Sequence, residues 1–218
     1  MAETFTSGCT NAVLEVGDDG LYYADGSLIG TQLRGKLPPR VLDYAYLIAE
    51  NAARYGVPEH FIAGVMAQES RGNPNAVSSA GAVGLMQLMP QYYGGNDNNR
   101  LFDPALNVQL GVETLANKAA KYDGNPLRVL AAYNSGGAHC KATPTDRWGL
   151  RTDPGYIDGC LGWANEAAYQ GFATRPYEPS VDVPPAPPAP PRRSLIPLLA
   201  FLGGGAVAVA AVLAIRRR

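Results

Sequence analysis

Charged residues, histidine and cysteine are scarce in this chain of 218 residues, and each shortage narrows the functions open to it. Only 17% of the residues are charged while 46% are hydrophobic, a balance that excludes a chain disordered throughout. Residues 1–191 hold 13 basic and 19 acidic residues, a formal charge of −6, and they show no basic stripe. We therefore expect no nucleic-acid partner, because phosphate contacts need clustered Lys and Arg.

The formal net charge of −1 conceals a basic C-terminal end. Residues 192–218 hold five arginines and no acidic residue, a charge of +5. Residues 195–215 carry no charge, and as a helix they would be about 31 Å long, close to the thickness of a bilayer core. Buried helices of soluble domains rarely run this far without a polar residue. We predict a transmembrane helix over 195–215 and a basic tail over 216–218, with the lipid bilayer as a partner.

Nine of the 18 prolines lie between Pro176 and Pro197, which predicts a proline-rich linker over 176–194. Such a segment favours extended polyproline II and does not fold on a core. Its Pro-x-x-Pro spacing is also that of a ligand for a proline-binding module, an alternative that stays open. At the other end of the chain, residues 1–15 lack the basic start and apolar run of a signal peptide, so none is expected.

The three cysteines, Cys9, Cys140 and Cys160, are an odd number, so at least one has no partner within the chain. Two alternatives stay open. Cys140 and Cys160 form a disulfide worth about 3 kcal/mol in an oxidising compartment, or both are free and buried. His139 and the cysteines lack the ligand spacing of a zinc site, and no EF-hand calcium loop is present. No metal or other cofactor is implied.

Turn signals separate an N-terminal extension, 1–37, from a mainly α-helical domain, 38–175. Two Asp-Gly pairs split short apolar runs within 12–33, and this pattern predicts a small β-hairpin or meander. From residue 38 onward the pattern is helical.

Helices are predicted from the spacing of apolar residues and from their capping residues. Apolar residues recur at helical spacing over 40–55 and 59–70, with Gly56 ending the first helix. Asp103-Pro104 and Asn125-Pro126 each place a capping residue before a proline, and they predict helices over 104–121 and 126–134.

One acidic residue continues the apolar stripe of the helix predicted over 59–70. Glu69 lies four residues after Val65 and seven after Ile62, at the C-terminal end of the helix. Burial disfavours the carboxylate, and so does the negative end of the helix dipole, which together predict a raised pKa. A glutamate protonated near neutral pH is suited to act as a general acid and then as a base. A glutamate turned to solvent at a frayed helix end is the alternative.

Glu69 is followed by short motifs in a fixed order. They read NPNAVS over 73–78, GLMQLMP over 84–90 and AYN over 132–134. From about Arg40 to Gly137, this set strongly resembles the SLT-type (family 1) lytic transglycosylases. The resemblance implies a lysozyme-like fold and a partner in peptidoglycan glycan strands, which such an enzyme cleaves at the β-1,4 bond between N-acetylmuramic acid (MurNAc) and N-acetylglucosamine (GlcNAc).

The resemblance also implies roles for single residues. Glu69 matches the family's one catalytic acid. Structural alternatives stay open for the other positions, since a methionine of this loop is equally suited to the core and Gln87 to bracing the loop. The implied substrate-binding positions are Ser78 near the N-acetyl group, Gln87 and Met89 along the glycan cleft, and Tyr133 and Asn134, whose tyrosine approaches the acid.

One acid is enough in this family because no water is consumed. The acid protonates the leaving oxygen, the substrate's acetamido group stabilises the oxocarbenium-like centre, and the 6-hydroxyl attacks to give a 1,6-anhydro sugar. A hydrolytic lysozyme (muramidase) is the alternative, and it needs a second carboxylate. Asp97 and Asp103 are the nearest candidates, but Asp97 lies in a polar turn and Asp103 is better explained as a helix cap.

Residues 138–175 extend beyond what the minimal domain of the family needs. They contain Trp148, Tyr156 and Trp163, which are candidates to stack on sugar rings. Covering the core is the interpretation that we favour for these three residues.

Two further interpretations concern activity and location. An inactive glycan-binding or structural virion protein is disfavoured by the joint presence of Glu69, Gln87 and Tyr133. A lytic domain with a C-terminal anchor and no export signal fits the virion of a membrane-containing bacteriophage, where it would serve genome entry. A virion membrane or capsid vertex would then be its partner. The bacterial inner membrane, with the catalytic domain facing the cell wall, is the alternative location.

Overall fold

The computed structural model of the chain describes residues 3–17, 21–30, 36–93 and 98–173. The predicted linker and membrane helix lie outside these residues. Within the described ranges, no helix combines the length and the apolar character needed to cross a bilayer.

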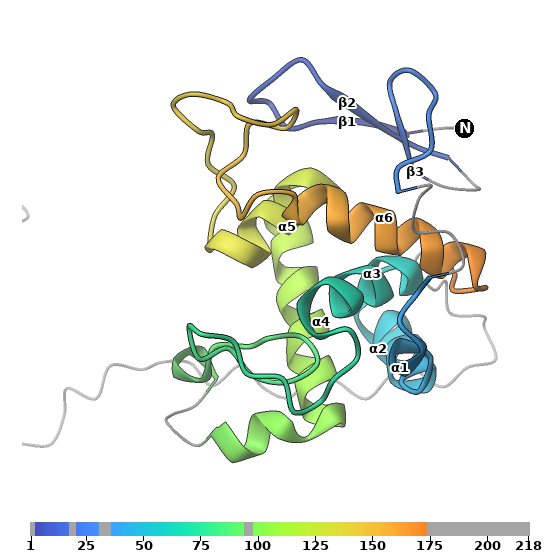
Figure 1. The fold of residues 1–218 in the computed structure, drawn as a ribbon, viewed down its shortest axis with the longest axis vertical. Coiled ribbons are helices and arrows are strands. Elements are labelled where there is room, and N and C mark those ends of the chain that lie inside the picture. Colours follow the sequence, from blue (N-terminus) through green and yellow to red (C-terminus); the bar gives the residue numbers. More distant parts are fainter. Residues whose placement is uncertain (1–2, 18–20, 31–35, 94–97, 174–218) are drawn as a thin grey trace, which may run out of the picture. The chain divides into compact units, whose positions relative to one another are not determined.

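Three short strands near the N-terminus form an antiparallel sheet in the order β1-β2-β3 (Figure 1). The side chain of Leu14 in the central strand is completely buried, and Leu14 pairs with Phe5 of the first strand. The meander predicted within 12–33 is confirmed, although its first strand lies before that range. The strands are β1, Glu3–Thr6, β2, Val13–Val16, and β3, Leu21–Tyr23.

The single helix predicted over 40–55 is wrong, because the chain forms two helices there, α1 (Pro39–Leu42) and α2 (Ala45–Tyr55). The backbone leaves helical geometry at Tyr44, with φ −108° and ψ 13°. Val41 in α1 and Ile48 in α2 are both fully buried, so the apolar periodicity continues across the break and does not reveal it. The predicted end at Gly56 is confirmed by its left-handed conformation.

The two helices predicted from capping residues are confirmed as α4 (Pro104–Lys121) and α5 (Pro126–Ser135). The Asp103 carboxylate accepts a hydrogen bond from the backbone N–H of Leu106 at 2.8 Å. The Asn125 amide oxygen accepts from the first turn of α5 in the same way. A side-chain acceptor followed by proline therefore begins each helix, as the local sequence requires.

The segment that joins α3 (Glu59–Ser70) to α4 is fixed by one buried asparagine of α4. The Asn107 side chain donates to the carbonyl oxygens of Val83 and Leu101 and accepts from the N–H of Met86. A Cβ atom on Gly84, whose φ is +80°, would lie 2.3 Å from the Asn107 amide nitrogen, so only glycine fits there. Two short 3₁₀ helices complete the segment, η2 (Pro90–Tyr92) and η3 (Asn98–Phe102).

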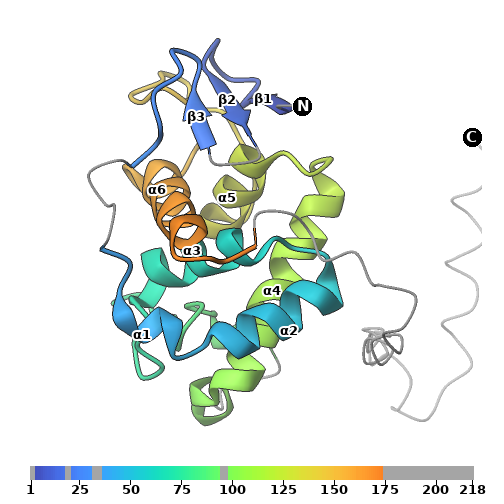
Figure 2. The same ribbon diagram turned by 90° about the vertical axis from the view of Figure 1, so that its right-hand side faces the viewer.

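The last helix, α6 (Tyr156–Tyr169), lies between the sheet and α3 (Figures 1 and 2). Most of its residues are buried, so it lacks the polar stripe by which a surface helix is recognised in a sequence. α6 crosses α3 closely, since a Cβ atom on Gly64 would lie 2.6 Å from the carbonyl oxygen of Cys160. From the side of the sheet, the buried Asn165 side chain binds the backbone of Leu21 and Ile29. Helix α6 is thereby held from both sides.

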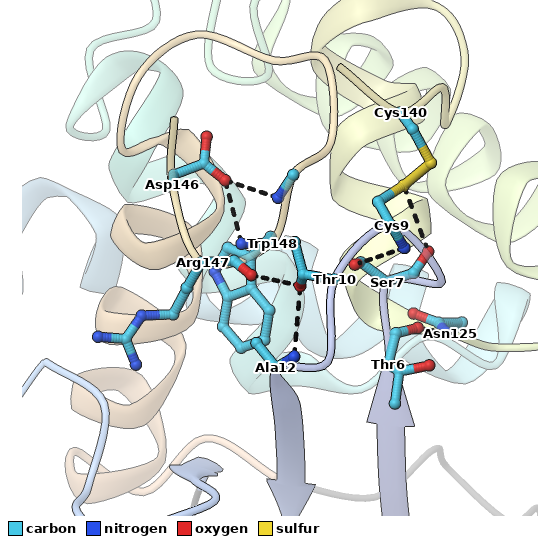
Figure 3. The surroundings of a disulfide bond; sticks show 11 residues. Thr6, Ser7, Cys9, Thr10, Ala12, Asn125, Cys140, Asp146, Arg147 and Trp148 are labelled. Carbon is cyan, nitrogen blue, oxygen red and sulfur yellow. Dashed lines mark hydrogen bonds between the residues drawn. A yellow bond between two sulfur atoms is a disulfide. The ribbon is translucent and has the colours of Figure 1, made fainter. Parts of the chain in front are cut away.

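A disulfide joins Cys9 to Cys140, which lie 131 positions apart in the sequence (Figure 3). The candidate pair Cys140–Cys160 is therefore wrong, and Cys160 is a free thiol buried in α6. The reason is tertiary, because the loop that carries Cys140 lies against the residues that follow β1. The Thr10 hydroxyl donates to the carbonyl oxygen of Arg147 at 2.5 Å and joins the same two segments beside the disulfide (Figure 3).

Candidate active site

Glu69 lies one residue before the end of α3, and its side chain is half-buried. Burial is the main cause of a pKa raised to about 7, against an ordinary value of 4.5. The charge of Asp153 adds to the rise in pKa, and a hydrogen bond from Tyr156 opposes it. The raised pKa expected from the helical stripe is confirmed. The carboxyl group is therefore divided between its two protonation states near neutral pH.

Tyr156 holds the Glu69 carboxyl group directly. Its hydroxyl donates to Glu69 Oε1 at 2.5 Å, from the first residue of α6. The side chain is 5% exposed, and burial raises the pKa of the phenol well above its ordinary value, so the group stays a donor. The sequence pattern places Tyr156 in the core, which is right for the ring and says nothing of the hydroxyl. No local signal marks this contact, because the partners lie 87 positions apart in the sequence.

Tyr133 of α5 lies within the electrostatic influence of Glu69 but bonds elsewhere. Burial raises the pKa of Tyr133 well above its ordinary value, and the charge of Glu69 raises it further. Its hydroxyl donates to the carbonyl oxygen of Met86 at 2.8 Å. The resemblance implies that Tyr133 approaches the acid. In the structure the hydroxyl bonded to the acid is that of Tyr156.

The acidic residue whose charge acts on Glu69 is Asp153, which neither spacing nor capping indicated. Of the two candidates for a second carboxylate, Asp97 lies outside the described residues and Asp103 caps α4. Asp153 is exposed, and it is held by Asn134. The Asn134 side chain donates to Asp153 Oδ2 at 3.1 Å and accepts from the Asp153 N–H at 2.9 Å. The Asn134 amide thus joins the AYN motif to the loop before α6.

The other predicted substrate-binding residues lie on the segment between α3 and α4. The Ser78 hydroxyl accepts from the N–H of Ala82 at 3.0 Å. The Gln87 amide donates to the carbonyl oxygens of Ala76 and Gly84, so this side chain braces the segment. Met89 is half-buried just before η2. Contact of these residues with a glycan stays a prediction.

The two tryptophans are core residues, as favoured from the sequence. Trp148 is 2% exposed and Trp163 is 7% exposed, which leaves little ring surface for a sugar. The Trp148 indole N–H donates to the Asp158 carboxylate of α6 at 2.9 Å. Within the described part of the chain, no three His, Cys, Asp or Glu side chains are grouped so that they could hold a metal ion. A carboxyl group with a pKa of about 7 is of the kind suited to proton transfer near neutral pH.

Comparison with known proteins finds similarity over the segment that contains Glu69. Residues 46–147 match the family described as Transglycosylase SLT domain. The chain is 39% identical over 127 residues to membrane-bound lytic murein transglycosylase C of Histophilus somni, a match that covers 50% of this chain and 35% of the relative. The protein of the same name from Haemophilus influenzae is 40% identical over 115 residues, which cover 44% of this chain and 32% of the relative. The chain thus spans about a third of the length of these relatives.

Two solved structures of lytic transglycosylases match part of the chain. An inactive mutant of Slt from Pseudomonas aeruginosa matches with a TM-score of 0.48 and 24% identity, over 60% of this chain and 25% of that one. The 70 kDa soluble enzyme from Escherichia coli matches with a TM-score of 0.44 and 20% identity, over 65% of this chain and 32% of that one.

Proposed function

We propose that this chain, whose residues 46–147 match the Transglycosylase SLT domain family, is a lytic transglycosylase of peptidoglycan. It would cleave the β-1,4 bond between MurNAc and GlcNAc and leave 1,6-anhydromuramic ends. The observation that carries the proposal is a single half-buried glutamate, Glu69, with a pKa raised to about 7 and a phenol bonded to it. The SLT match and the similarity to proteins named lytic murein transglycosylase support it.

In the proposed reaction Glu69 first donates one proton to the substrate and later accepts one proton from it. Protonated Glu69 gives its proton to the O4 atom of GlcNAc as the bond from that oxygen to C1 of MurNAc breaks. The acetamido group of MurNAc stabilises the positive charge at C1. The 6-hydroxyl of the same sugar then attacks C1 and returns its proton to Glu69. The Tyr156 hydroxyl on Oε1 keeps the carboxyl group oriented in both steps.

Following the resemblance, four further residues are proposed to line the glycan, and the fifth implied position, Asn134, is bonded to Asp153. Gln87 and Met89 lie on the segment that Asn107 fixes, which would present a rigid wall to the substrate. The remaining positions are Ser78 and Tyr133. The proposed domain covers residues 38–175.

Hydrolysis, the reaction of a lysozyme, is the second candidate, and one observation favours it. The Asp153 carboxylate lies close enough to Glu69 to raise the pKa of that group. An inverting glycosidase uses such a second carboxylate to activate water. The two reactions differ in their products, because water leaves a reducing MurNAc end whereas attack by the 6-hydroxyl leaves an anhydro end.

Digestion of purified peptidoglycan followed by mass spectrometry tests the proposal. Wild-type protein should release anhydro-muropeptides, and Glu69→Gln should lower the rate by about 1000-fold, since Gln cannot transfer the proton. The matched control is Glu50→Gln on α2, where an exposed glutamate pairs with Arg54, and its rate should equal that of the wild type. Reducing-end products would favour hydrolysis. Absence of products would leave a glycan-binding or structural protein.

We further propose that residues 195–215 anchor the enzyme in a membrane, with residues 176–194 as a spacer and 216–218 as a basic tail. The uncharged run of 21 residues supports this, and the two relatives above are named membrane-bound. The membrane of a bacteriophage virion is the proposed location, and genome entry the proposed purpose. Recovery from the envelope of uninfected bacteria, and absence from purified virions, would contradict the virion and favour the inner membrane.

A further inference from the structure

Asn134 makes two hydrogen bonds to a single residue of the loop before α6. Its Nδ2 donates to Asp153 Oδ2 at 3.1 Å, and its Oδ1 accepts from the Asp153 N–H at 2.9 Å. The two bonds use both ends of one amide, so they fix the backbone and the side chain of Asp153 together. Asn134 lies at the C-terminal end of α5, two residues before its capping residue Gly136.

Asp153 in turn sets where α6 begins. Its carbonyl oxygen accepts from the N–H of Tyr156 at 3.1 Å and from the Thr152 hydroxyl at 2.8 Å. The residue before the helix is Gly155, in the left-handed region, and no side chain caps this end of α6. The position of the first turn therefore depends on the backbone of Asp153, and Tyr156 is the first residue of that turn.

We propose that Asn134 is a positioning residue for Glu69, acting through Asp153 and Tyr156. The amide of Asn134 clamps Asp153, Asp153 places the start of α6, and the Tyr156 hydroxyl then meets Glu69 Oε1 at 2.5 Å. This inference rests on the proposed function of Glu69 as the acid. It assigns to the AYN motif a structural connection between α5 and the acid, in place of direct contact between Asn134 and the glycan.

The groups around Glu69 determine the direction in which each substitution should shift its pKa. The titratable neighbours are Tyr156, Tyr133, Asp153 and the buried Cys160. The Tyr156 bond lowers the pKa of Glu69, so losing it raises that pKa. The charge of Asp153 raises the pKa of Glu69, so removing that charge lowers it. Loosening the clamp and neutralising Asp153 are therefore expected to move the pKa of Glu69 in opposite directions.

The experiment compares Asn134→Ala, Tyr156→Phe and the double variant in the full chain. Asn134→Ala should lower kcat for muropeptide release roughly ten-fold with KM unchanged, because the acid is misplaced while glycan binding is kept. In the Tyr156→Phe background the same change should cost about two-fold or less, since the connection is already cut. Asn11→Ala, a matched change at an exposed asparagine between β1 and β2, should leave the rate unchanged.

The pKa of Glu69 is read without substrate, by carboxyl ¹³C NMR titration. Asn134→Ala should raise this pKa, as Tyr156→Phe does. Asp153→Asn keeps an oxygen acceptor for the Asn134 amide but removes the charge, so it should lower the pKa of Glu69. If Asn134→Ala instead raises KM and its effect adds fully to that of Tyr156→Phe, Asn134 contacts the glycan and the proposal fails.

The test separates this inference from the function on which it rests. If the wild-type protein releases no products from peptidoglycan, the proposed function fails. The titration then still tests whether Asn134 positions Glu69 through Asp153 and Tyr156. An unchanged Glu69 pKa in Asn134→Ala would overturn that inference. The thermal unfolding of each variant, followed by circular dichroism, verifies that the compared proteins are folded.

Discussion

The SLT-matched segment, residues 46–147, contains Glu69, whereas the residue that orients Glu69 comes from outside it. We call the second region the flanking layer and define it as residues 3–17, 21–30 and 148–173. The matched segment encloses the acid with apolar side chains of α3 and raises its pKa by burial. The flanking layer adds the Tyr156 hydroxyl, on a helix that the N-terminal sheet supports through Asn165. In this molecule the protonation state and the orientation of the acid depend on different regions.

The largest effect is expected where the flanking layer is tied to the rest of the chain. Cys9→Ser removes a disulfide that closes a loop of about 130 residues, and we expect the free energy of unfolding to fall by about 2–5 kcal/mol. Urea unfolding followed by tryptophan fluorescence is suitable because both tryptophans, Trp148 and Trp163, lie in the flanking layer. Reductant should lower the stability of the wild type to that of the variant. A variant as stable as the oxidised wild type would contradict the prediction.

A second effect is expected within the matched segment and concerns stability against pH. Because the pKa of Glu69 is about 7 in the folded protein and near 4.5 when unfolded, the folded state binds more protons between these values. Its wild-type contribution to stability is therefore lost as pH rises from about 4.5 through about 7. Glu69→Gln has no such loss. The free energy of unfolding of the variant minus that of the wild type should therefore be about 2 kcal/mol larger at pH 8 than at pH 4. Chemical denaturation at both pH values measures this, and parallel pH curves would refute it.

A third prediction separates orientation from protonation. Tyr156→Phe keeps the buried ring and removes the hydroxyl, so kcat/KM should fall about ten-fold, the loss of one hydrogen bond to a charged group. The same change removes a bond that lowers the pKa of Glu69, so the decline of kcat/KM on the alkaline side should move to higher pH. The pH profile of muropeptide release measures both effects. An unchanged rate together with an unmoved profile would mean that Tyr156 acts by packing alone.

The smallest effects compare two helix caps. Asp103→Ala removes one cap of α4 inside the matched segment and should cost about 1 kcal/mol of stability. Asn125→Ala removes the cap of α5 and also a bond from the Asn125 amide to the Thr6 carbonyl oxygen of the flanking layer, at 2.8 Å (Figure 3). It should therefore cost about 1 kcal/mol more than the change at Asp103. Equal losses in thermal unfolding would show that the bond to Thr6 adds nothing.

Features that depend on neighbouring residues could be predicted from the sequence. The starts of α4 and α5 follow from a capping side chain that directly precedes a proline. The raised pKa of Glu69 follows from its place on the apolar stripe of α3. The break at Tyr44 between α1 and α2 was hidden because the apolar face is the same on both sides of it.

Features that depend on distant residues could not be predicted in this way. α6 gives no periodic signal, because it is buried against α3 and against the sheet at the same time. Nothing in the local sequence distinguishes Asp153 from Asp97 or Asp103. Asp153 influences the pKa of Glu69 because the loop before α6 brings its carboxylate near that residue. The disulfide pairs the first two cysteines of the chain because the sheet brings Cys9 to the loop of Cys140, while Cys160 faces the interior.

By itself, the sequence determined the place of Glu69 on the apolar stripe of its helix, the order of the motifs and the starts of the capped helices. Each of these features is encoded by residues that are close together in the chain. The sequence also contains the uncharged run 195–215, which lies outside the described residues. The tertiary structure alone decided which tyrosine holds Glu69, which carboxylate raises its pKa and which cysteines pair. These contacts join residues 84 to 131 positions apart. Such pairs form only when packing places their elements side by side, and no local pattern records that placement.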